Sequence, residues 1–165
     1  MTVIIDVQGF IDYGNSFIVK ELAALNLVTG KFHQYIFQEP RTLTPADIKF
    51  FDQIRWVTTF HHGLPWCGGD TPYCQLKHTI LHVCEQATDV LVKGSEKANF
   101  IRTLVGPDIN VTDLTTFQCP ALNVVRPRTN YCKIPQHKNS QYTCAVANVS
   151  WLSSWYNRER NKGGV

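Results

Sequence analysis

The first forty residues alternate between short apolar segments and turn residues, a pattern typical of β-strands. Apolar residues cluster at 3–6, 17–27 and 31–38. The turn-rich stretch 9–15 separates the first two segments, and Thr29 with Gly30 separates the last two. Because consecutive short strands joined by turns pair antiparallel, the pattern predicts a three-stranded meander.

Beyond residue 44 the apolar spacing changes to that of helices, interrupted by two further short strands. Thr44 and Pro45 are typical of a helix start, and a second helix is expected from Tyr73. The remaining pattern predicts a strand at 89–93, a helix at 95–105, a strand at 110–114 and a final helix from about 143. This order predicts an α/β fold with a mixed sheet, three antiparallel strands followed by alternating helices and strands.

Composition and length limit the chain to one globular unit. The 165 residues are 44% hydrophobic and 18% charged, which excludes a mainly disordered chain. We expect one domain at 1–157 and a flexible tail at 158–165. The net charge of +3 permits nucleic-acid binding without requiring it.

The cysteines are expected to be reduced. The first residues lack the basic segment of a signal peptide, and no apolar run is long enough to span a bilayer, so we expect a cytoplasmic or nuclear protein that does not enter membranes. In that compartment the six cysteines favour metal binding over disulfides.

The element order and several short motifs resemble ribonuclease-H-like exonucleases of the DEDDh type. Asp6-Val7-Gln8 is similar to their Asp-x-Glu strand, and segments 92–101, 111–114 and 143–149 are similar to three later motifs. The family holds two divalent ions with four carboxylates and activates water with a histidine. The corresponding positions here are Asp6, Gln8, Lys97, Thr143 and Asn148.

A single carboxylate cannot neutralise two divalent ions, so the resemblance implies that this site has lost its ordinary chemistry. Lys97 replaces an acid and would place a positive charge where a cation sits in active relatives. A third hypothesis is an active exonuclease that uses Asp6 together with acids that the alignment does not place at the site, such as Asp12, Asp89 or Asp113.

The spacing Cys132-x4-His137-x6-Cys144 suits tetrahedral zinc in a reducing compartment. Glu21 lies among apolar neighbours on the second strand, where a carboxylate needs a partner, and is the expected fourth ligand. The alternative is a surface acid on an edge strand, with two buried thiols and a surface histidine.

The Glu-Cys-His-Cys set on a degenerate DEDDh scaffold resembles the MAEL domain of Maelstrom proteins. Segments 20–40 and 131–149 carry most of this resemblance, which extends over most of the chain. It implies a bound zinc ion and a link to small-RNA silencing of transposons. Because some members of that family are associated with RNA cleavage, it also leaves a divergent ribonuclease open.

Other residues suggest binding surfaces. We expect Lys93 and Lys97 near the degenerate site, extended by Arg126, Arg128 and Lys133, to contact nucleic acid. Lys138 adds charge to the last three around the zinc-binding loop, and Tyr131 and Tyr142 in the same region are suited to base stacking. The four tryptophans are expected in the core. A rival metal cluster comprises Cys67, Cys74, His78 and His82, and a nucleophile-activating pair at His61 and His62 is a weaker alternative.

Three functional hypotheses follow from the sequence. The leading one is a zinc-stabilised protein that binds nucleic acid, with single-stranded RNA favoured, and lacks DEDDh exonuclease activity. The second is a protein-interaction module on the same fold. The third is a metal-dependent nuclease with a divergent active site.

Overall fold

The chain folds around a five-stranded mixed sheet with strand order β3-β2-β1-β4-β5. The computed structural model describes residues 1–122, 131–139 and 141–163. The strands are β1 (Thr2–Ile11), β2 (Phe17–Asn26), β3 (Phe32–Ile36), β4 (Asp89–Val92) and β5 (Asn110–Asp113). The first three pair antiparallel, whereas β4 and β5 run parallel to β1. The predicted α/β class and element order are therefore confirmed.

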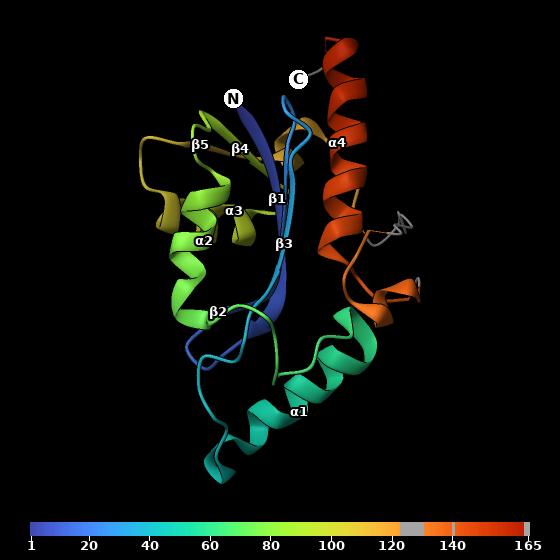
Figure 1. The fold of residues 1–165 in the computed structure, drawn as a ribbon. Helices are drawn as coiled ribbons and strands as arrows, with labels where there is room; N and C mark the ends of the chain where they lie inside the picture. The colour runs from blue at the N-terminus through green and yellow to red at the C-terminus, as the bar shows by residue number, and fades with distance from the viewer. Residues whose placement is uncertain (123–130, 140, 164–165) are drawn as a thin grey trace.

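Helices cover both faces of this sheet. They are α1 (Ile48–Val57), α2 (Leu76–Val83), α3 (Ser95–Val105) and α4 (Ala145–Asn161). Figure 1 shows α2 and α3 on one face, α4 along the other, and α1 below the end of the sheet. A π-helical turn, Thr58–His62, continues α1 towards the segment that precedes α4.

The alternation of side chains along β1 decides which residues reach α4. Val3, Ile5 and Val7 are buried in the core beneath α2 and α3, whereas Ile4 packs in the core beneath α4. Because successive side chains of a strand point to opposite faces, Asp6 also faces α4. The Asp6 carboxylate is therefore directed into the interior, where it is fully buried.

Two elements differ from the sequence-based boundaries. Strand β1 continues through Gly9 to Ile11 because a register shift follows Gln8, and a Cβ at Gly9 would lie 1.9 Å from the Ile18 carbonyl oxygen. Helix α4 ends at Asn161, so the described start of the expected tail is helical. Arg158 and Arg160 in its last turn suit the negative end of the helix dipole.

No helix in the described ranges is both long and apolar enough to cross a membrane.

Candidate metal centre and adjoining cleft

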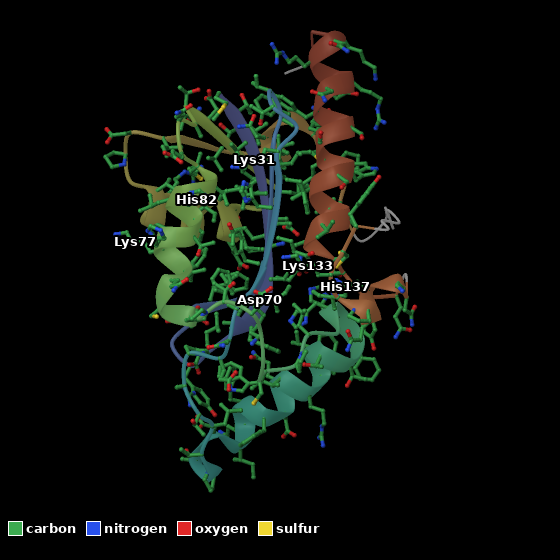
Figure 2. The ribbon with its side chains drawn as sticks, viewed as in Figure 1. Lys31, Asp70, Lys77, His82, Lys133 and His137 are labelled. Atoms are coloured by element: carbon green, nitrogen blue, oxygen red, sulfur yellow. The ribbon has the colours of Figure 1, made fainter. Side chains whose placement is uncertain are left out.

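Four metal-ligating side chains from three parts of the fold meet beneath the start of α4. Glu21 projects from β2, Cys132 and His137 come from the segment between β5 and α4, and Cys144 immediately precedes α4. One ligand atom from each lies within 4.8 Å of all the others. The structure thus brings together the four residues expected to bind zinc, and Figure 2 shows His137 where this segment meets the end of α1.

The spacing of these ligand atoms suits a tetrahedral ion. The His137 Nδ1 atom lies 3.4 Å from the Cys132 Sγ atom and 3.8 Å from the Glu21 Oε2 atom. The Cys132 Sγ atom lies 3.9 Å from the Glu21 Oε1 atom. Metal–ligand bonds of about 2.0–2.3 Å in a tetrahedron place neighbouring ligands roughly 3.3–3.8 Å apart. The distances that join Glu21, Cys132 and His137 are close to this range, and all four ligand atoms lie within 4.8 Å of one another, so the arrangement could hold one metal ion.

Outer hydrogen bonds orient the ligands in the way that protein metal sites usually require. The His137 Nε2 atom lies 2.6 Å from the His62 carbonyl oxygen, which can only accept, so Nε2 carries a proton and Nδ1 is the ring nitrogen that faces the cluster. Gln34 donates to Glu21 at 2.8 Å and to Cys132 at 3.2 Å. The Ala145 backbone N–H donates to Glu21 at 3.0 Å.

Burial and close contacts shift the pKa values of the clustered side chains. Burial raises the pKa of Glu21 to about 7, although the nearby His137 opposes the shift. A hydrogen bond from Cys144 lowers the pKa of the Cys132 thiol to about 4, while the pKa of Cys144 is raised. Several acidic groups thus converge at one buried point, where a divalent cation would supply the missing positive charge.

Glu21 is an interior residue, because β2 lies between β1 and β3, and the surface-acid alternative is therefore wrong. Gln34 is the participant that sequence reasoning missed. Its carboxamide donates into the cluster and accepts from the Lys133 backbone N–H at 2.9 Å. A polar residue between Phe32 and Ile36 on a predicted strand was the available signal.

The rival cysteine–histidine cluster does not assemble. Within the described ranges, the Glu21 set is the single group of three or more side chains that could hold a metal. Cys67 and Cys74 are exposed, and His82 instead lies beside His33, with ring centroids 5.7 Å apart.

His62 does not activate a nucleophile. It is buried, and its Nδ1 atom accepts from the Leu64 backbone N–H while Nε2 contacts the Gly9 carbonyl oxygen. Burial lowers the pKa of His62 to about 3, so the ring is neutral. Its role is to hold the end of α1 against β1.

A second buried carboxylate, Asp6, lies on the neighbouring strand and receives three donors. The Lys97 ammonium donates to it at 2.5 Å, and the side-chain amides of Gln8 and Asn148 each donate at 2.8 Å. Asp6 is fully buried, whereas the Lys97 side chain is 25% exposed. The buried carboxylate of Asp6 therefore has a cationic partner, the Lys97 ammonium.

No other acid in the described structure joins Asp6. Asp12 pairs with Arg41, and Asp89 accepts from Thr88 and Asn110. Asp113 accepts from the backbone N–H groups of Gly94 and Thr115. The acids proposed for a divergent nuclease are thus held at separate places.

The Asp6 group borders a cleft of about 390 Å³ between β1, α1 and α4. The polar part of its lining is given by Gln8, Gln53, His61, Lys97, Thr143 and Asn148. Thr143 is at the expected cleft, and its backbone N–H donates to the His61 carbonyl oxygen at 2.8 Å. The five positions aligned with DEDDh motifs on the basis of the sequence therefore lie at or beside this cleft.

The remaining basic residues are more dispersed. Lys93 donates to the Cys119 carbonyl oxygen at 2.6 Å and to Thr115. Lys133 is largely exposed and lies near Asp70, as labelled in Figure 2. Arg126 and Arg128 lie outside the described residues.

The metal cluster and the cleft share the first turn of α4. Cys144 and Ala145 contact the cluster, and Asn148, one turn later, donates to Asp6. On the opposite side, His137 and Thr143 contact consecutive carbonyl groups of the π-helical turn that follows α1. Displacing the cluster would therefore displace both walls of the cleft.

Comparison with known proteins does not assign the chain to a family. No family model matches the chain, and no curated protein matches its sequence.

Removing Lys97 alone should lower the free energy of unfolding more than removing the charges of both Asp6 and Lys97. Lys97→Met should lower the free energy of unfolding by about 1–3 kcal/mol, because it leaves a buried carboxylate without its cation. Asp6→Asn combined with Lys97→Met should recover most of that loss. Urea denaturation of the parent, Lys97→Met, Asp6→Asn and the double variant measures the coupling free energy between the two side chains. An additive double-mutant cycle would show that the pair does not interact.

Proposed function

We propose that this protein is a zinc-stabilised, ribonuclease-H-like protein that binds single-stranded RNA and lacks two-metal nuclease activity. One observation carries the proposal: the Lys97 ammonium is bound to Asp6 where a DEDDh nuclease would hold a cation. The amides of Gln8 and Asn148 complete this substitution by donating to the same carboxylate. The site has donors where metal binding requires acceptors.

The architecture supports the ribonuclease-H-like assignment. Three antiparallel strands precede two parallel strands, and the last helix packs beside β1. This arrangement brings positions 6, 8, 97 and 148 together, as the resemblance to DEDDh and MAEL domains requires. The contacts among these four residues thus support the alignment on which that resemblance rests.

Zinc is the ion that the donor set favours. Two thiol groups and an imidazole are soft or borderline ligands, whereas magnesium and calcium select oxygen. Glu21, Cys132, His137 and Cys144 supply four ligands, which suits a closed structural site. Once bound, zinc would supply positive charge and fix the segment before α4, and it has no catalytic role in the proposal.

The cleft supports binding of a phosphate-bearing strand. With Asp6 already saturated, the polar groups that line the cleft include lysine, histidine, threonine and amide side chains. Such groups position nucleic-acid backbones without sequence selectivity. The chain's net charge of +3 acts in the same direction.

Purified protein that folds normally without a bound metal ion would overturn the proposal that zinc stabilises the fold. Purified protein should contain one zinc per chain, and Cys144→Ser should lose it and lower the melting temperature sharply. Structural zinc contributes on the order of 10 kcal/mol to folding in small domains. Cys84→Ser is the matched control, because Cys84 is equally buried but lies in the core beneath α2. Equal effects of the two substitutions would count against a metal at Cys144.

RNA binding and cleavage are tested on the same preparation. Single-stranded RNA should bind with an affinity that falls as salt rises, because phosphate contacts release counterions. The RNA should remain intact with Mg²⁺ or Mn²⁺. Metal-dependent shortening that Asp6→Ala abolishes would establish the divergent nuclease, and an absence of binding would favour the protein-interaction module.

A further inference from the structure

Two large aromatic side chains lie exposed on the helix that forms one wall of the cleft. Trp56 is 59% exposed and Phe60 is 67% exposed. Their ring centroids are 6.0 Å apart, with an angle of 47° between the ring planes. The rings contact each other without stacking face to face, so most of each ring surface remains in solvent.

The helix pattern explains why these rings are outside the core. Phe50, Ile54 and Val57 form the face that packs against Trp66 and β1. Trp56 and Phe60 lie one position away from Val57 and His61, roughly 100° around the helix from that face. The expectation that all four tryptophans lie in the core is therefore wrong for Trp56.

The exposed rings adjoin the cleft lining along the same helix. Gln53, Val57 and His61 line the cleft at successive helical turns. Trp56 and Phe60 each precede one of these residues in the sequence, so the two rings follow the lining residues along this part of the chain.

The charged groups around the rings are one lysine and one ion pair. Lys49, Gln53, Trp56 and Phe60 follow one helical stripe, and Asp52 lies one turn before Trp56 on the same side of the helix. Asp52 pairs with Arg55 at 3.0 Å, so this acid has a cationic partner. A strand of phosphates therefore meets no unpaired acid among the described residues of this stripe.

We propose that Trp56 and Phe60 form a stacking platform for bases of a single strand of RNA whose backbone enters the Asp6–Lys97 cleft. The inference rests on the proposed function and assigns the surface that binds the bases. Aromatic rings bind single-stranded bases by stacking, whereas paired bases have their faces covered by neighbours. Lys49 beside two open rings provides a phosphate contact and a stacking surface for such a strand.

The test uses the intrinsic fluorescence of Trp56. Trp66 and Trp155 are buried and Trp151 is half-buried, so Trp56 is the tryptophan most accessible to a ligand. Oligouridylate should quench the protein's fluorescence, and Trp56→Leu should remove most of the quenching. Trp56→Leu should weaken affinity by at least about fivefold, whereas Trp56→Phe should retain most of it.

Phe51 provides the matched control. It lies on α1, is 43% exposed, and borders a different hollow with Pro65 and Trp66. Phe51→Leu should leave RNA affinity within about twofold of the parent. Circular dichroism and melting temperature should be unchanged in all three variants, because none of the replaced rings is buried.

The outcomes separate this inference from the proposed function. Salt-dependent RNA binding that Trp56→Leu and Phe60→Leu leave unchanged would overturn the platform and retain the RNA-binding function. A parent that binds no RNA would overturn both. Equal losses from Trp56→Leu and Phe51→Leu would overturn the platform, because they would indicate a broad apolar contact. Equal affinity for single-stranded and double-stranded RNA would also overturn it.

Discussion

Two buried carboxylates on adjacent strands constrain the face of the sheet that packs against α4. Asp6 on β1 and Glu21 on β2 are both fully buried, and Gln8 is the direct register partner of Glu21. A buried carboxylate requires a cation or several donors, because burial removes its hydration. The structure satisfies Asp6 with a lysine and two amides, and surrounds Glu21 with the remaining ligands of a metal cluster.

The start of α4 contacts both buried carboxylates, Glu21 and Asp6. The Ala145 backbone N–H and Cys144 face Glu21, and Asn148 reaches Asp6 from the same turn. His137 also contacts the π-helical turn Thr58–His62, which follows α1 and contains Phe60 of the exposed aromatic pair. A metal ion bound at the Glu21 cluster would therefore influence the shape of the cleft about one helical turn away.

Much of this arrangement could be predicted from sequence. The spacing of Cys132, His137 and Cys144 indicated a metal site, and the apolar neighbours of Glu21 placed its carboxylate in the interior. The resemblance to DEDDh exonucleases likewise implied a positive charge near Asp6, because Lys97 aligns with an acid of that motif. The cysteine and histidine spacing is a local pattern, whereas the position of Lys97 could be predicted only through the resemblance.

Other features depend on tertiary contacts that no local pattern contains. The role of Gln34 depends on its approach to a segment almost one hundred residues later. The exposure of Trp56 depends on which face of α1 meets the sheet, and its hydrophobic character alone suggested burial. The length of β1 was underestimated because the turn-forming residues near Gly9 are accommodated by a register shift.

We propose that one metal ion binds at the Glu21 cluster and organises the cleft. X-ray absorption spectroscopy of the purified protein at the zinc edge identifies the ion and its ligands. We expect one zinc with two sulfur ligands at about 2.3 Å and two nitrogen or oxygen ligands at about 2.0–2.2 Å. Folded protein without zinc, or zinc surrounded by nitrogen and oxygen alone, would contradict the account.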